Sequence, residues 1–207
     1  MMTIGIIATT DQRETLEKQG LAADIRIEWM DQPHPVAGVD AIIDLLNKQD
    51  MYSAEWTSGS STLLFINQVE EAIENQPAHF IRFNGWPGFW ERPLLEASCT
   101  SAEIKTKAEQ VMALFGKKIS WVNDVPGFLT ARVVAGIINE AYLTLGEGVS
   151  TKEAIDTAMK LGTNYPNGPF EWTQKIGAAR IVQLLTRLGK EAPYYLPAPL
   201  LLKEAEN

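Results

Sequence analysis

The sequence is poor in the residue types that build metal centres and disulfide networks. It has one cysteine, Cys99, and two histidines, His34 and His79, among 207 residues. A single cysteine excludes an intramolecular disulfide framework and is typical of a reducing compartment. These three side chains do not provide a ligand cluster for a transition metal, so no metal is expected. We expect Cys99 to be an ordinary, partly buried thiol.

The chain also lacks an excess of basic charge and any long hydrophobic run. It has 18 Lys and Arg against 26 Asp and Glu, which gives a net charge of −8. This balance argues against a nucleic-acid surface and against a polybasic membrane contact. No apolar run is long enough to span a bilayer, and residues 1–14 lack the features of a signal peptide. We therefore expect a cytoplasmic protein that binds neither nucleic acid nor membrane.

Short apolar segments alternate with polar segments along residues 1–122. Such alternation predicts strands separated by helices, and hence an α/β domain with a parallel sheet. The predicted strands are residues 3–8, 25–30, 39–46, 62–66, 79–83, 94–98 and 118–122. The predicted helices are residues 11–19, 68–75 and 100–115, with Asp11 and Thr100 as candidate caps.

The composition changes near Asn123, and residues 123–207 predict a second, all-helical domain. A long apolar run opens this part and ends at Gly146. Its apolar stripe is too wide for a surface helix, so we expect a largely buried helix. The stripe consists of Leu129, Val133, Ile137 and Ala141, with Val134, Ile138, Tyr142 and Leu145 beside them. Ser150 and Glu153 predict a capping box for a second helix that ends at Gly162, and a further helix follows through Leu184, Leu185 and Leu188.

Several motifs in residues 123–207 resemble the C-terminal domain of the 3-hydroxyacyl-CoA dehydrogenases. They are PGFLTAR, INEAYLTLGEGVST, IDTAMKLGTNYPNGPFEW and YYLPAPLLLK, in this order along the chain. The resemblance implies a fold with an abbreviated Rossmann-like sheet in residues 1–122. It also implies NAD-linked oxidation of 3-hydroxyacyl-CoA in fatty-acid metabolism, and a homodimer formed through residues 123–207.

In this family, a glycine-rich loop follows the first strand and lets the backbone approach the pyrophosphate of NAD. Here the corresponding turn, Ala8–Asp11, contains no glycine. The Asp11 carboxylate would also repel a diphosphate. Asp31, at the end of the second predicted strand, stands where a ribose-binding acid would be, or it is an exposed aspartate at a strand end. NAD is therefore expected from the family, but these residues predict that it is not bound.

The family's catalytic His and Glu correspond, by resemblance, to Asn84 and Glu96. An amide does not titrate near neutral pH, so Asn84 cannot act as the base. Asn84 either hydrogen-bonds a thioester or is a turn residue before Gly85. His79 lies at an odd offset from Asn84, which predicts the opposite face of the strand. Arg82 either meets a phosphate or carboxylate or remains solvated at the surface.

The remaining candidate site residues also follow from the resemblance. Asn67 matches a family asparagine, whereas Val69 and Ala131 replace a substrate-contacting serine and asparagine. Trp86 and Trp90 either line an acyl pocket or fill the volume that a cofactor would occupy. Two functions therefore stay open. One is a 3-hydroxyacyl-CoA dehydrogenase with an altered site, and the other is a non-catalytic homologue that binds acyl-CoA or serves as an assembly subunit.

Overall fold

The computed structural model describes residues 1–19, 25–33, 38–48, 52, 61–73 and 77–206. It divides into two compact units. The α/β unit consists of Met1–Gln68, Ile73–Gly85 and Phe89–Asp124, and the helical unit of Val69–Ala72, Trp86–Gly88 and Val125–Asn207. Two short loops from the first half of the chain thus belong to the helical unit. The domain limits 1–122 and 123–207 remain a prediction.

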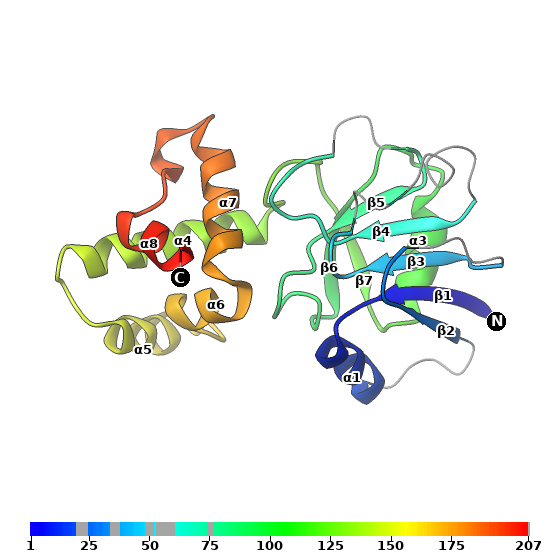
Figure 1. The fold of residues 1–207 in the computed structure, drawn as a ribbon, viewed down its shortest axis with the longest axis horizontal. Coiled ribbons are helices and arrows are strands. Elements are labelled where there is room, and N and C mark those ends of the chain that lie inside the picture. The colour runs from blue at the N-terminus through cyan, green and yellow to red at the C-terminus, as the bar shows by residue number, and fades with distance from the viewer. Residues whose placement is uncertain (20–24, 34–37, 49–51, 53–60, 74–76, 207) are drawn as a thin grey trace. The chain divides into compact units, whose positions relative to one another are not determined.

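The α/β unit is built on one seven-stranded sheet (Figure 1). Its strands are β1 (Met2–Ile7), β2 (Ile25–Met30), β3 (Ala41–Asp44), β4 (Leu63–Ile66), β5 (Phe80–Phe83), β6 (Leu94–Ser98) and β7 (Lys118–Trp121). The order is β2-β1-β3-β4-β5-β6-β7, and every pairing is parallel except that of β5 with β6. The predicted α/β domain is confirmed, and its sheet is parallel in every pairing but one. The predicted strands 79–83 and 94–98 are present as β5 and β6, but the expectation of a parallel sheet is wrong for this pair.

Alternate residues of the central strands enter two different hydrophobic clusters. Leu63 and Phe65 of β4 pack into the cluster that includes Leu16 of α1 (Thr10–Gln19) and Val111 of α3 (Lys105–Ala113). Leu64 and Ile66 of the same strand pack into the cluster on the other face. Because successive side chains point to opposite faces of a sheet, an unbroken apolar run fills both layers.

Two predictions for this unit are wrong. The described residues of the predicted helix 68–75, residues 68–73, are not helical. The carbonyl of Val69 instead accepts a hydrogen bond from the Gly127 amide at 2.8 Å, so a distant partner replaces the intrahelical one. The capping box at Thr100 does not form, because α3 begins at Lys105, and its N-cap residue Ile104 makes no side-chain hydrogen bond.

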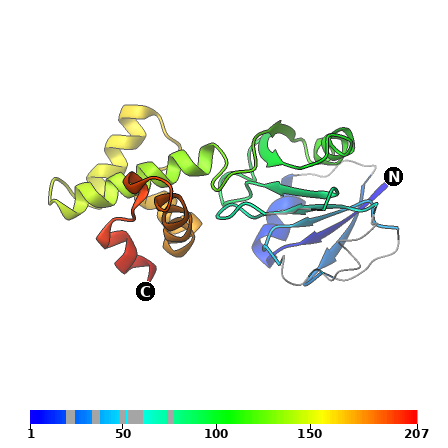
Figure 2. The same cartoon turned by 90° about the horizontal axis from the view of Figure 1, so that it is seen from above.

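The helical unit contains five α-helices in the described residues and one short 3₁₀ helix (Figures 1 and 2). They are α4 (Thr130–Gly146), α5 (Lys152–Thr163), α6 (Pro169–Ile176), α7 (Ala178–Gly189), η2 (Pro193–Tyr195) and α8 (Pro199–Ala205). Gly177, with φ of 95°, separates α6 from α7 where we expected one helix. The cap of α5 is Thr151, one residue after the predicted Ser150. Among the described residues, no helix is long and apolar enough to cross a membrane.

The expectation that the long helix is largely buried is wrong for one stripe. Residues such as Ile138 and Tyr142 are buried on one side of α4. Leu129, at its start, is 60% exposed, and Val133 is 51% exposed. The apolar pattern therefore predicts the helix correctly, but it does not predict that the stripe with Leu129 and Val133 is exposed.

Buried polar side chains join the helices of this unit by capping backbone groups. Asn139 of α4 donates to the Leu196 carbonyl at 2.9 Å and accepts from the Ala198 amide at 2.7 Å. The Asp156 carboxylate of α5 accepts from the amides of Phe170 and Glu171 at 2.8 and 3.2 Å, and so caps the start of α6. These bonds supply acceptors for N–H groups that a helix leaves unpaired in its first turn.

Replacing Asp156 by alanine should lower the free energy of unfolding by about 1–2 kcal/mol, because two amides at the start of α6 lose their acceptor. Urea denaturation followed by circular dichroism measures the change. The matched control is Glu140→Ala, an exposed position within α4. Equal stability of the two variants would contradict the capping role of Asp156.

Candidate functional site

The candidate site lies at the carboxyl ends of the parallel strands, where open α/β sheets bind their ligands. The start of α1 follows β1 at this edge of the sheet. The Thr9 amide donates to Gln12 Oε1 at 2.9 Å, and the Gln12 amide donates to Thr9 Oγ1 at 3.2 Å. This reciprocal pair is a capping box, and it supplies side-chain acceptors for the Thr9 and Gln12 amides at the start of α1.

The prediction that Asp11 caps this helix is wrong, because the cap is Thr9. Asp11 lies exposed in the first turn of α1. The spacing of Thr9 and Gln12 was the available signal, since Ser or Thr followed three residues later by Glu or Gln is typical of a capping box. Asp31 is exposed directly after β2, which pairs with β1. Its position suits both interpretations, and a ribose contact stays a prediction.

The structure brings together the two residues at the family's catalytic positions. The register of β5 and β6 pairs Arg82 with Ser98 and Phe83 with Ala97, and the Asn84 amide donates to the Glu96 carbonyl at 3.0 Å. Residues directly opposite on antiparallel strands place their side chains on the same face, about 5 Å apart. Asn84 is 1% exposed and Glu96 is 8% exposed. The catalytic role of Glu96 and the substrate role of Asn84 stay predictions.

Arg82 stands next to this pair and is fully buried, so of its two alternatives the solvated side chain is wrong, and a carboxylate contact is the one observed. Its Nε donates to Asp124 Oδ1 at 2.5 Å, and its Nη1 donates to the Gln68 carbonyl at 2.9 Å. The Ser98 hydroxyl donates to the same Asp124 oxygen at 2.9 Å. The sequence feature that indicates this placement of Arg82 is its offset of two residues from Asn84, because such an offset puts both side chains on one face of the strand. The positive charge of Arg82 is thus balanced within the α/β unit.

Asn67 holds the ends of three strands together. Its side-chain amide donates to the carbonyls of Leu45 and Gly85 at 2.9 and 3.0 Å, and its Oδ1 accepts from the Gly85 amide at 2.9 Å. Both N–H groups of the side chain are therefore used on backbone carbonyls. One lone pair of Oδ1 remains for another donor, so a substrate contact by Asn67 stays a prediction.

The two candidate tryptophans are packed inside different units. Trp90 belongs to the core of the α/β unit, where its ring lies 5.5 Å from that of Phe83 and 4.5 Å from Lys117 Nζ. Burial lowers the pKa of the Lys117 ammonium. Trp86 is fully buried in the helical unit, and its Nε1 donates to Glu70 Oε1 at 2.9 Å. These contacts favour the interpretation that the rings fill volume. Acyl contacts by Trp86 and Trp90 remain a prediction.

Asp44, which the sequence analysis missed, is a fully buried carboxylate at the end of β3. It accepts hydrogen bonds from the amides of Leu46 and Lys48 at 2.9 and 2.6 Å and from the Tyr52 hydroxyl at 3.3 Å. Burial raises the pKa of Asp44, and burial beside this carboxylate raises the pKa of Tyr52. The only sequence feature that indicates Asp44 is its position as a charged residue at the end of an apolar run. Among the described residues, no group of three or more His, Cys, Asp and Glu is arranged to hold a metal ion.

Replacing Gly85 by alanine should destabilise the protein by about 1–3 kcal/mol, because a buried methyl group without space forces its neighbours to move. A Cβ atom there would lie 2.6 Å from the Phe83 ring and 2.7 Å from the Asn67 amide carbon. The same change at Gly162, in α5, meets nothing within 4 Å. It should stabilise the helix by about 0.5–1 kcal/mol. Chemical denaturation measures the change in the free energy of unfolding of both variants. A change of the same sign in both would contradict the tight packing around Gly85.

The fold and several motifs of this chain match known proteins. Residues 127–206 match the family model "3-hydroxyacyl-CoA dehydrogenase, C-terminal domain". The 3-hydroxyadipyl-CoA dehydrogenase of Escherichia coli is 46% identical over 206 residues, which cover 91% of this chain and 40% of that protein. A 3-hydroxybutyryl-CoA dehydrogenase of Bradyrhizobium diazoefficiens is 40% identical over 115 residues, 55% of this chain and 39% of that protein. The chain thus spans less than half the length of these two relatives.

A solved structure shows the same fold over nearly the whole chain. The (S)-3-hydroxybutyryl-CoA dehydrogenase PaaH1 of Ralstonia eutropha superposes with a TM-score of 0.73 and 21% identity. The match covers 98% of this chain and 93% of that one. At this identity the likeness concerns the fold alone. The family model and the sequence relatives place the chain in the 3-hydroxyacyl-CoA dehydrogenase family.

Proposed function

We propose that this chain is a non-catalytic member of its family, which does not perform NAD-linked turnover and acts as an assembly subunit. The capping box at the start of α1 carries this proposal. A nucleotide diphosphate needs free backbone N–H groups at a helix start. Here the Gln12 amide already donates to the Thr9 hydroxyl and the Thr9 amide to the Gln12 side chain, and no glycine in Ala8–Asp11 permits close approach of the backbone. These residues do not fit the family's cofactor, so we derive no hydride-transfer step.

The residues opposite each other on β5 and β6 support the same proposal. A dehydrogenase needs a base that takes the proton from the substrate hydroxyl, and a carboxylate that orients this base. Asn84 stands opposite Glu96, and its carboxamide has no proton-accepting nitrogen near neutral pH. Glu96 therefore has no imidazole to orient at this position. We infer that Glu96 stands opposite an amide at the position where the family places an imidazole.

The same pair favours acyl-CoA binding without turnover as a second candidate function. The N–H groups of Asn84 can donate a hydrogen bond to a thioester carbonyl, and such binding does not require proton transfer. Asn67, Trp86 and Trp90 would contribute to binding in this case. We place this candidate second, because the rings of both tryptophans are packed within their own units.

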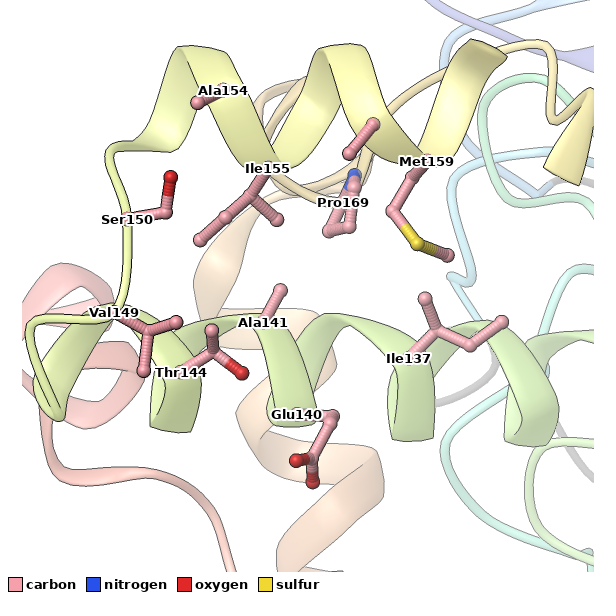
Figure 3. A pocket seen from close by; sticks show the side chains of 11 residues that line it. Ile137, Glu140, Ala141, Thr144, Val149, Ser150, Ala154, Ile155, Met159 and Pro169 are labelled. Carbon is pink, nitrogen blue, oxygen red and sulfur yellow. The ribbon is translucent and has the colours of Figure 1, made fainter. Parts of the chain in front are cut away.

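Assembly through the helical unit is supported by an uncovered apolar surface. A groove of about 420 Å³ lies between α4 and α5. Figure 3 shows Ile137 and Ala141 of α4 facing Ile155 and Met159 of α5 across it. The exposed Leu129 and Val133 extend the apolar surface along α4 towards its start, at helical spacing from Ile137. Exposed apolar surfaces of this kind are typical of protein–protein contacts. We propose a homodimer through residues 123–207.

NADH fluorescence titration tests the absence of cofactor binding. The protein should show no enhancement at NADH concentrations up to 100-fold above those that saturate the R. eutropha dehydrogenase used as a positive control. In the same buffer, acetoacetyl-CoA should not be reduced above background. Micromolar NADH binding would overturn the proposal. So would a steady loss of NADH absorbance that disappears in Glu96→Gln.

Multi-angle light scattering tests the dimer. The expected mass is twice the 23.0 kDa of one chain. Ile137→Glu should shift the protein to the monomer, because it buries an unpaired charge in the groove contact. Leu161→Glu is the control, since Leu161 is 82% exposed and does not line the groove. A monomer at high concentration of the unmodified protein would refute the dimer.

A further inference from the structure

The helical unit contains a second pocket, which is separate from the groove between α4 and α5. Its volume is about 240 Å³, and residues of α4, α5 and α8 line it. They are Tyr142, Leu145, Lys152, Leu200, Lys203 and Glu204, and none of them lines the groove proposed for the dimer. Pockets for drug-sized ligands measure roughly 300–1,000 Å³, so this smaller pocket suits a small molecule.

Bonds within the helical unit hold the three helices that surround this pocket. α4 and α8 pack against each other (Figure 1). Lys152 Nζ, at the start of α5, donates to Glu204 Oε2 of α8 at 2.6 Å. Asn139 of α4 binds the Leu196 carbonyl and the Ala198 amide just before α8. All residues of the pocket therefore belong to one compact unit, whose own packing forms it.

The Tyr142 hydroxyl is a buried polar group on the wall of this pocket. Tyr142 is 1% exposed, and its hydroxyl oxygen makes no hydrogen bond within the part of the chain that the structure describes. A buried polar group without a partner costs free energy, so a ligand that supplies an acceptor there is favoured. Burial, together with the nearby Glu204 carboxylate, raises the pKa of Tyr142. The hydroxyl therefore keeps its proton and can donate it to an acceptor.

The charged residues of the pocket favour a negatively charged ligand. Two ammonium groups, of Lys152 and Lys203, stand against the one carboxylate of Glu204. A cation has no place here, because the Lys152 ammonium already pairs with Glu204. The same ammonium lies 5.5 Å from the centre of the Tyr142 ring and 5.2 Å from that of Phe170. One of the three N–H donors of Lys152 binds Glu204, which leaves donors for an anion.

The remaining wall of the pocket is aliphatic. Leu145 of α4 and Leu200 of α8 provide it, and Leu200 is 38% exposed, so an apolar ligand would remove part of it from water. We propose that this pocket binds a short aliphatic carboxylic acid. The carboxylate accepts from the Tyr142 hydroxyl and pairs with the ammonium groups of Lys152 and Lys203. The aliphatic body covers the two leucines. The proposal uses no residue of the α/β unit and does not rest on the proposed function.

Titration of the full chain with sodium hexanoate, followed by two-dimensional heteronuclear NMR, tests this binding site. The backbone amides of residues 142–145 and 200–204 should shift with one shared, saturable dissociation constant in the millimolar range. Hexanamide keeps the aliphatic body but lacks the charge, and acetate keeps the carboxylate but lacks the body. Each of these two probes should bind at least fivefold more weakly than hexanoate.

Two variants separate ligand binding from folding. Tyr142→Phe keeps the ring and removes a hydroxyl that has no partner among the described residues. It should weaken hexanoate binding at least threefold, while the urea midpoint of unfolding stays unchanged. Lys203→Gln removes one positive charge and should weaken binding at least fivefold. The matched control is Lys190→Gln, at an exposed lysine of the same unit that does not line the pocket, and it should leave the affinity unchanged.

Three outcomes would overturn the carboxylic-acid site. The absence of saturable shifts with hexanoate would show that the pocket takes no such acid. Equal affinities for hexanoate and hexanamide would show that the ammonium groups do not recognise the carboxylate. An unchanged affinity in both Tyr142→Phe and Lys203→Gln would place the binding elsewhere on the chain. None of these outcomes bears on NADH binding or on the mass of the dimer, so the site and the proposed function are tested separately.

Discussion

The reversal of direction between β5 and β6 is the constraint on which the candidate site depends. Every other neighbouring pair in the sheet is parallel. Because β5 and β6 are antiparallel, residues on either side of their connection face each other, and Asn84 meets Glu96. The same register places Arg82 and Ser98 side by side, where both bind Asp124. A parallel connection would have put these side chains at opposite ends of the strands. The reversal thus places the side chains of Asn84 and Glu96 on one face of the strand pair.

Side chains that bind backbone groups hold distant segments of the fold together. Asn67 binds backbone groups of the segments that follow β3 and β5, Asp156 caps α6, and Thr9 with Gln12 caps α1. Each arrangement satisfies backbone groups that would otherwise need water or a ligand. At the start of α1 the acceptors for the Thr9 and Gln12 amides are supplied by the chain itself.

Local patterns predict the strands and most helices, but they do not predict the antiparallel pairing that brings Asn84 opposite Glu96, nor the long-range attachments. Apolar runs identify buried strands because the sheet is covered on both faces. The region around Glu70 was predicted as a helix, since nothing nearby shows that its partner Arg180 is 110 residues away. The burial of Arg82 was missed for the same reason, because Asp124 is 42 residues distant. Such contacts are set by tertiary packing, which spacing along the chain does not encode.

Spacing along the chain also does not predict that one apolar stripe of α4 is exposed, and this exposure bears on assembly. A helix that is apolar on most sides indicates burial, but the pattern does not say whether the cover comes from the same chain. Here the chain covers the side of Ile138 and Tyr142 and leaves Leu129 and Val133 in solvent. Large exposed aliphatic side chains beside an apolar groove are unfavourable in water unless another surface covers them. The sequence pattern and the structure therefore agree if α4 is buried in an assembly rather than in the single chain.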